Sequence, residues 1–143
     1  MFDKTKTHEL LRGVRLFEGL DDAALRRISS QFKSYAFPAG ASVIAEDSSG
    51  RFGRMYVVVS GTATARVHDD AVATYGPGDS FGEMSALDGQ PRSAAVVADT
   101  DLETLGLSAW NMRALLREEP DIALHVIQVL TTRLRAANEA AND

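Results

Sequence analysis

The stretch GPGDSFGEMSALDGQPRSAA, residues 76–95, decides the fold, because it interrupts a series of short β-rich runs with a short helical segment. Gly82 allows the backbone to approach a ligand closely, and the first helical turn leaves amide donors unpaired. Arg92 follows Glu83 by nine residues. A guanidinium can bind two phosphate oxygens at once, whereas an ionised carboxylate only accepts hydrogen bonds and suits a sugar hydroxyl. The stretch therefore predicts a site for a nucleotide-like ligand.

Arg92 is also isolated among acidic residues. It is the only Lys or Arg between Arg66 and Arg113, a span that contains eight Asp and Glu residues. The whole chain has 15 Lys and Arg against 20 Asp and Glu, a net charge of −5, which argues against non-specific nucleic-acid binding through charge. We therefore expect a small-molecule site, and no nucleic-acid binding by this chain alone.

The composition excludes several other chemistries. The chain has no Cys, which excludes a disulfide scaffold, a Cys-ligated zinc site, an iron–sulfur cluster and a thiol nucleophile. Its histidines, His8, His68 and His125, are too far apart for metal-ligand or catalytic spacing. We therefore predict no metal site, no catalytic residue and no enzymatic activity. No segment approaches the roughly 18 apolar residues of a membrane span, and we expect a cytoplasmic protein.

Short strands dominate the middle of the chain and helices its ends. The β-rich runs, separated by turns with Gly, Pro or Ser, are Ser42–Ala45, Met55–Val59, Thr62–Val67, Ala94–Ala98 and Leu102–Leu107. Asp21 and Ser108 are predicted helix N-caps, and Pro120 is predicted to start the last helix. We predict one domain, residues 1–143, with N-terminal helices at 1–36, a β-roll at 37–107 and C-terminal helices at 108–143.

The last helix is predicted to be amphipathic. Its apolar stripe, at the helical period of 3.6 residues, consists of Ile122, Val126, Val129, Leu130, Leu134 and Ala137. Such a stripe usually covers a core, and it can also serve as the output surface of a domain that changes shape with a ligand.

At two short motifs the chain resembles the cyclic nucleotide-binding domain family. Phe81-Gly82-Glu83-Met84 and Pro91-Arg92-Ser93-Ala94 are similar to the phosphate-binding cassette of that family, which here corresponds to residues 78–95. The resemblance extends over most of the chain, through Leu16-Phe17, Pro38-Ala39-Gly40, the run from Met55 to Gly61, and Pro120-Asp121-Ile122. It implies a mainly β fold with helices: an eight-stranded, jelly-roll-like antiparallel β-barrel flanked by N-terminal helices and two C-terminal helices.

The resemblance also implies a role for individual residues. Arg92 would bind the exocyclic phosphate oxygens and Glu83 the ribose 2′-hydroxyl. Backbone amides of the cassette would add donors, and an amide side chain near the end of the last helix would contact adenine. The predicted ligand-binding residues are Gly82, Glu83, Met84, Ser85, Arg92, Ser93, Ala94 and Asn138.

Two interpretations without a ligand stay open from the residues alone. Ser80 and Glu83 have the spacing of a capping box, in which Glu83 would bond the Ser80 amide. Arg92 could instead form a structural ion pair with a nearby acid, and the candidates are Asp79, Asp88 and Glu83. The sequence departs from the family pattern at Ser85-Ala86, at Ala95 and at the turn Ser48-Ser49-Gly50-Arg51.

The function that the resemblance implies is that of a sensor. Cyclic AMP would be the ligand, favoured over cyclic GMP by analogy at Ser93, and no other cofactor is expected. The last helix would close over the base as a lid and transmit the signal, and it could form a homodimer. The effector is unknown. Three alternatives are a transcription regulator of the catabolite-activator type that needs further sequence to bind DNA, the gating domain of a cyclic nucleotide-regulated channel, and a structural barrel that binds no ligand.

Overall fold

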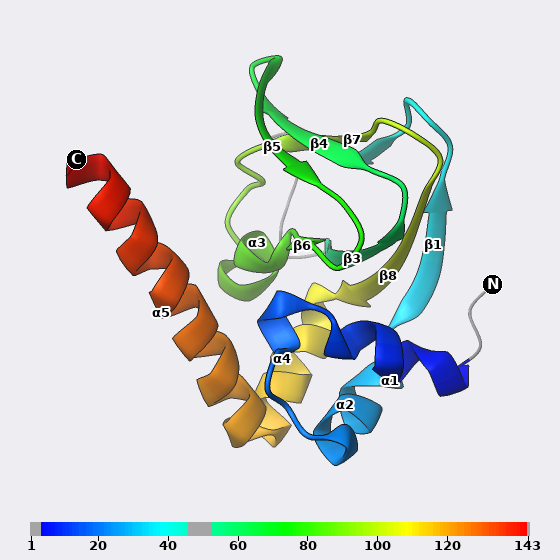
Figure 1. Cartoon of the computed structure of the whole chain (residues 1–143), viewed down its shortest axis with the longest axis vertical. Coiled ribbons are helices and arrows are strands. Elements are labelled where there is room, and N and C mark those ends of the chain that lie inside the picture. The colour runs from blue at the N-terminus through cyan, green and yellow to red at the C-terminus, as the bar shows by residue number, and fades with distance from the viewer. Residues whose placement is uncertain (1–3, 46–52, 143) are drawn as a thin grey trace.

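The strands of the protein form two antiparallel sheets. The computed structural model describes residues 4–45 and 53–142. Within them the strands are β1 (Lys33–Phe37), β2 (Ser42–Ile44), β3 (Arg54–Ser60), β4 (Ala63–Val67), β5 (Asp70–Tyr75), β6 (Ser80–Phe81), β7 (Ala95–Ala98) and β8 (Leu102–Ser108). One sheet has the order β1-β8-β3-β6 and the other β2-β7-β4-β5. An apolar core lies between the two sheets, and Figure 1 shows the path of their strands.

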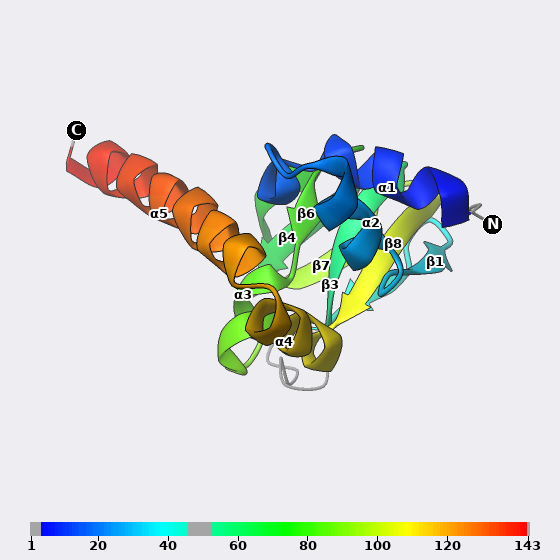
Figure 2. The ribbon, with the colours of Figure 1, turned by 90° about the horizontal axis from the view of Figure 1, so that it is seen from below.

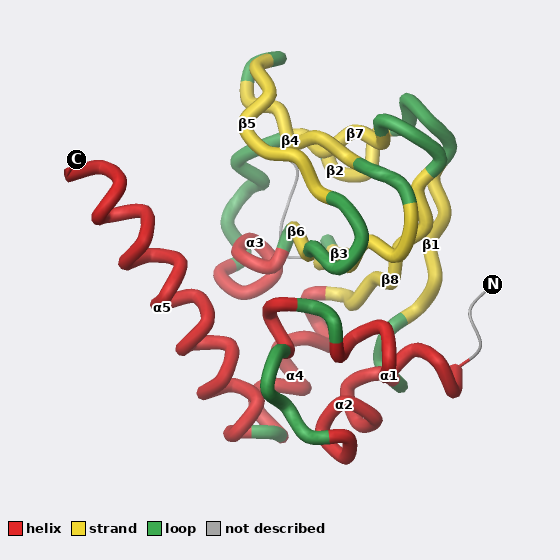
Figure 3. The backbone as a smooth tube through the Cα atoms, in the orientation of Figure 1, coloured by secondary structure: helices red, strands yellow, loops and turns green. Residues whose placement is uncertain are grey.

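Helices gather at one end of the roll and between its strands. They are α1 (Lys4–Arg12), the 3₁₀ turn η1 (Arg15–Phe17), α2 (Asp22–Ser29), α3 (Glu83–Asp88), α4 (Ala109–Glu118) and α5 (Pro120–Asn142). Figure 3 shows that α3 is the helix inserted among the strands, whereas α1, α2 and α4 lie together beneath them. The predicted caps are confirmed, because Asp21 accepts from the Ala24 amide at 2.8 Å and Ser108 from the Asn111 amide at 3.0 Å.

Two apolar clusters hold the domain together. The larger joins the N-terminal helices, α4 and the first half of α5 to β3 and β8, and its fully buried members include Leu11, Leu25 and Met112. The smaller lies between the sheets, where Tyr56 stacks on Phe81 with ring centroids 5.5 Å apart. Apolar burial at roughly 25 cal/mol per Å² makes these clusters the main source of stability.

The last helix changes its surroundings halfway along its length. Ile122 and Val126 are buried in the larger cluster, and Val129 and Leu130 pack against it in part. From residue 131 to 141 every side chain is exposed. The predicted stripe therefore covers the core only over its first part, and Leu134 is 61% exposed. Figures 1 and 2 show the second half of α5 standing away from the strands. None of the described helices is both long and apolar enough to cross a membrane.

The predicted fold class, mainly β with flanking helices, is confirmed. One boundary is different, because β1 begins at Lys33, within the segment 1–36 that was predicted to be helical. The strands β5 and β6 also went unpredicted. The turn at 48–51, where the sequence departs from the family pattern, lies outside the described residues.

Candidate functional site

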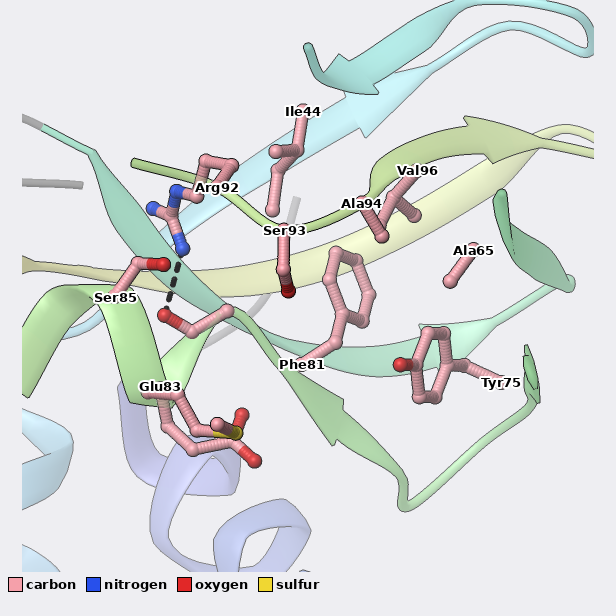
Figure 4. A pocket seen from close by; sticks show the side chains of 12 residues that line it. Ile44, Ala65, Tyr75, Phe81, Glu83, Ser85, Arg92, Ser93, Ala94 and Val96 are labelled. Atoms are coloured by element: carbon pink, nitrogen blue, oxygen red, sulfur yellow. Dashed lines mark hydrogen bonds between the residues drawn. The ribbon is translucent and has the colours of Figure 1, made fainter. Parts of the chain in front are cut away.

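Arg92 lies in the segment between α3 and β7, with its side chain inside the protein. The residue is 4% exposed. Its Nη1 donates to the carbonyl oxygen of Gly82 at 2.7 Å, and its Nη2 donates to the carbonyl oxygen of Arg54 at 2.8 Å. The guanidinium therefore bridges the cassette and the first residue of β3, as Figure 4 shows for the Gly82 bond.

The charge of Arg92 is not neutralised by a carboxylate within residues 4–45 and 53–142. The ion pairs there are Arg12–Asp22, Arg27–Glu119 and Arg133–Glu83. The predicted alternative of a structural ion pair between Arg92 and a nearby acid is therefore wrong. Burial lowers the pKa of Arg92 below its ordinary value, and nearby Tyr56 and Glu83 raise it in part. A buried cation whose partners in the described part of the chain are neutral carbonyl groups still has its full charge to offer to an anion.

Glu83 begins α3 on the other side of the site. The residue is 7% exposed, and its Oε1 accepts from Arg133 Nη1 of α5 at 3.0 Å. Its Oε2 is buried and has no hydrogen-bond partner among the described residues. The N-cap of α3 is Gly82, with no side-chain cap bond, so the capping-box interpretation is wrong. Buried acceptors are rarely left without a donor, and this oxygen is therefore available to one from outside the chain.

Gly82 has to be glycine for two reasons. Its φ of 86° lies in the left-handed region that side chains disfavour. A Cβ at this position would also lie 2.8 Å from the Arg54 carbonyl oxygen and 3.0 Å from Arg92 Nη1. The absent side chain thus makes room for the guanidinium that Gly82 itself helps to hold.

An open cleft of about 130 Å³ runs between Arg92 and Glu83. Its lining residues are Ile44, Ala65, Tyr75, Phe81, Gly82, Glu83, Met84, Ser85, Arg92, Ser93, Ala94 and Val96. The charged groups stand at opposite sides of it, and Figure 4 shows Glu83 directing its carboxylate away from Arg92. Tyr75 stacks on Phe81 with centroids 4.9 Å apart. The cleft therefore offers a cation, an acceptor and a flat apolar wall.

Residues 35–119 match the family model of the cyclic nucleotide-binding domain. The chain belongs to this family. The match confirms the resemblance to this family that the sequence motifs predicted.

Several curated proteins are similar to this cyclic nucleotide-binding domain. The cyclic AMP receptor protein of Thermus thermophilus is 35% identical over 90% of this chain and 61% of its own length. The CRP-like cAMP-activated global transcriptional regulator of Mycobacterium tuberculosis is 29% identical over 94% of this chain and 62% of its own. The chain thus spans less than two thirds of these relatives. The solved N-terminal domain of a transcriptional regulator from Streptomyces coelicolor aligns with a TM-score of 0.78 and 27% identity, covering 92% of this chain and 94% of that one.

The structure brings the predicted residues of the cassette together. Those that line the cleft are Gly82, Glu83, Met84, Ser85, Arg92, Ser93 and Ala94. Asn138 does not line it and is exposed on the second half of α5. Because successive helical residues are about 100° apart, Asn138 points roughly 140° away from Arg133, the residue that faces Glu83. A contact between Asn138 and a base stays a prediction.

Sequence reasoning missed the apolar wall and the link to α5. Besides Tyr75 and Phe81, the apolar wall of the cleft includes Ile44, Ala65 and Val96, which come from three strands. Only the alternation of apolar residues could have indicated that they face inward. Arg133 lies 50 residues after Glu83, and no local pattern predicts their ion pair.

Proposed function

We propose that the domain is a sensor that binds cyclic AMP and is not an enzyme. The observation that carries this proposal is the buried Arg92 guanidinium, which bonds two backbone carbonyl groups and has no carboxylate partner in the described chain. Burying a cation is costly unless its charge is compensated, and a phosphate monoanion compensates it through charge-assisted hydrogen bonds. The cyclic phosphate would lie against Arg92, with the amides of Gly82, Ser85 and Ser93 as further donors.

The ribose would lie at Glu83. A 2′-hydroxyl donates one hydrogen bond, and the buried Oε2 of Glu83 is an acceptor that nothing else in the described chain uses. Because Oε1 is the atom that pairs with Arg133, the hydroxyl can bind Oε2 without breaking that ion pair. The sugar and Arg133 would then share one carboxylate.

The last helix would act as the lid and the output. Ligand sites are typically about 300–1,000 Å³, whereas this cleft is about 130 Å³ and open, so a nucleotide needs further cover. The half of α5 beyond Arg133 is exposed and close in sequence to the Glu83 contact. Movement of this half over the base would bury the ligand and change the surface that α5 presents.

The base and the larger assembly are inferred from the relatives. Two of them carry cyclic AMP in their names, and cyclic AMP is therefore the first choice over cyclic GMP. A cyclic nucleotide-gated potassium channel of Rhizobium etli is also 35% identical, over 85% of this chain and 33% of its own. The main proposal is that the domain serves a regulator, because the two regulators named above match more of the chain than the channel does. Channel gating is the alternative.

A melting-temperature screen tests the function directly. Any ligand that binds only the folded state raises the melting temperature with its concentration. Cyclic AMP is expected to raise it most, cyclic GMP less, and AMP least, because AMP carries a dianionic, non-cyclic phosphate. The Arg92→Ala variant should show a much smaller shift with cyclic AMP than the parent protein shows. Equal shifts in the variant and the parent protein would contradict the proposal, as would no shift in the parent.

A second copy of the chain is the proposed partner of α5. The exposed residues of its outer face recur at alternating spacings of three and four, and they are Leu124, Ile127, Thr131, Leu134, Asn138 and Ala141. This is the spacing of a coiled-coil seam, in which one polar residue such as Asn fixes the register. Leu124, Ile127 and Leu134 are each more than half exposed, which is costly for a lone helix.

Mass measurement in solution tests this pairing. Light scattering coupled to size-exclusion chromatography should give a dimer that the Leu134→Asp variant converts to a monomer. The Arg135→Asp variant, one position along the helix and outside the seam core, should stay dimeric. A monomeric parent protein at high concentration would contradict the proposed homodimer and leave the ligand site unaffected.

A further inference from the structure

Gly53, the residue before β3, lies against the guanidinium of Arg92. A Cβ placed on Gly53 would overlap Arg92 Nη2 and would lie 3.1 Å from Cζ and 3.3 Å from Nε. Nη2 is the atom that donates to the Arg54 carbonyl oxygen. Any side chain at position 53 therefore competes with the guanidinium for the place from which it makes this bond.

The backbone conformation at position 53 does not by itself demand glycine. Among the residues that the structure describes, the glycines with positive φ are Gly19, Gly40, Gly61, Gly78, Gly82 and Gly89, and Gly53 is not among them. The three atoms nearest to its Cβ position all belong to the end of the Arg92 side chain. The requirement at Gly53 is thus for space beside one functional group, whereas Gly82 is constrained by its φ as well.

Arg54, the residue after Gly53, supplies the carbonyl oxygen that accepts from Arg92 Nη2. The guanidinium of Arg54 lies 4.4 Å from the centre of the Tyr35 ring, and its Nη1 is 3.5 Å from the Tyr56 hydroxyl. These contacts, together with the pairing of β3 and β8, keep the Arg54 backbone in place. The Arg54 carbonyl is therefore a stable acceptor for Arg92, provided that Gly53 leaves the approach open.

We infer that Gly53 is a positioning residue for the phosphate contact of Arg92, an inference that rests on the proposed function. A guanidinium recognises phosphate through a planar fork, so its use depends on orientation as well as on charge. Two of its five N–H groups are oriented by carbonyl oxygens. A methyl group at position 53 pushes Nη2 off the Arg54 carbonyl and turns the remaining donors away from the phosphate position.

A purely structural role for Gly53 makes a different prediction. The Gly53 carbonyl oxygen accepts from the Ala109 amide at 2.9 Å, which links it to the start of α4. Alanine keeps this carbonyl group, so the link survives the substitution. If Gly53 served only the fold, its replacement would affect all ligands equally, whether or not they carry a phosphate.

The test compares Gly53→Ala with Gly13→Ala by calorimetry, using cyclic AMP and adenosine as probes. The Cβ of Gly13→Ala meets only the Leu10 carbonyl oxygen, at an ordinary 3.7 Å, and its φ is also not positive. Gly53→Ala is expected to bind cyclic AMP about tenfold to 100-fold more weakly, the effect of one misplaced charge-assisted contact. Adenosine, which lacks the phosphate, should bind all variants alike. Equal losses for both probes, or no loss for cyclic AMP, would overturn the inference.

If Gly53→Ala does not fold in the parent protein, the same substitution is tested in the Arg92→Ala variant. In Arg92→Ala the crowding atoms are gone, so Gly53→Ala added to it should fold and should bind cyclic AMP no worse than Arg92→Ala alone. A double variant that stays unfolded, or that loses affinity further, would show that Gly53 acts through the backbone and would overturn the inference. If the parent protein binds no cyclic nucleotide, the proposed function itself fails, whereas a binding parent with an unaffected Gly53→Ala variant overturns only the role of Gly53.

Discussion

The two charged ends of the cleft are held in opposite ways. Arg92 is 4% exposed and bonds backbone carbonyl groups that belong to β3 and the cassette. Glu83 is almost as buried, at 7% exposed, but it bonds Arg133 of the second half of α5. The side chain of Arg133 is 41% exposed. One end is therefore fixed by the strands, and the other depends on an element that stands away from them (Figure 2).

Because the two ends are held differently, we expect Arg92 to set the affinity for the ligand and Glu83 to couple the ligand to the position of α5. A ligand can shift an element between two positions only if it binds them unequally. Arg92 offers the same surroundings wherever α5 lies, so its contact adds affinity without selecting a position. Glu83 shares its carboxylate with Arg133 of α5, so we expect a hydroxyl on Oε2 to be linked to the position of the helix. We therefore expect substitutions at the phosphate end to weaken binding and those at the ribose end to weaken coupling.

The largest effect is expected from Arg92→Ala, which removes the fixed end. Loss of two charge-assisted contacts to phosphate costs about 3–4 kcal/mol, or roughly 100- to 1,000-fold in affinity. Calorimetry with cyclic AMP measures it. The variant should still bind adenosine like the parent, because the apolar wall is intact. An unchanged affinity for cyclic AMP would falsify the assignment of Arg92 to the phosphate.

A smaller effect is expected from Glu83→Ala, measured with cyclic AMP and its 2′-deoxy form. The parent protein should prefer cyclic AMP by about 10- to 100-fold, the worth of one hydrogen bond to a charged acceptor at about 1.5–3 kcal/mol. The variant should bind both ligands alike, since neither finds an acceptor. A preference that persists in Glu83→Ala would mean that another group binds the 2′-hydroxyl.

The end held by α5 is tested more sharply by Arg133→Ala. A partly exposed ion pair is worth about 0–1 kcal/mol, so the affinity for cyclic AMP should fall by less than about tenfold. Hydrogen exchange should report the larger change. Cyclic AMP is expected to slow exchange in the second half of α5 in the parent protein, and to slow it much less in the variant. Arg135→Ala, on the same exposed segment, is the control and should behave like the parent. Equal protection of α5 in both variants would remove the distinction between the two ends.

The same contrast describes what the sequence could predict. The proposed phosphate site draws on residues between 78 and 95, so local motifs could predict it, and the helix caps at Asp21 and Ser108 are equally local. The unpredicted strands β1, β5 and β6 lie at sheet edges, where one side stays unpaired and the apolar alternation is weak. The Arg133–Glu83 pair and the approach of Gly53 to Arg92 depend on how distant segments pack. No sequence pattern records such distances.

The smallest expected effect concerns Tyr75, which lines the cleft and stacks on Phe81. Burial raises the pKa of Tyr75, and Glu83 and Asp79 raise it further, while Arg133 lowers it. Since the pKa of an unfolded tyrosine is about 10, the neutral phenol of Tyr75 stabilises the folded state fully below pH 10. That stability is lost as the pH rises from 10 through the folded pKa. Tyr75→Phe keeps the stacking on Phe81 and removes the titrating group.

Denaturant unfolding between pH 8 and pH 11 measures this difference. The parent protein should lose more stability above pH 10 than Tyr75→Phe does, and the two should run parallel below it. Burial is the largest cause of the raised pKa and Glu83 adds to it, so Glu83→Ala should reduce the difference, whereas Arg133→Ala should increase it by removing a cation that lowers the pKa. Opposite responses of one phenol to these two substitutions would place Tyr75 in the electrostatic field of the ion pair between the cassette and α5. If the difference from Tyr75→Phe were the same in the parent, Glu83→Ala and Arg133→Ala backgrounds, Tyr75 would sense burial alone, and the α5-dependent end would extend no further than Glu83.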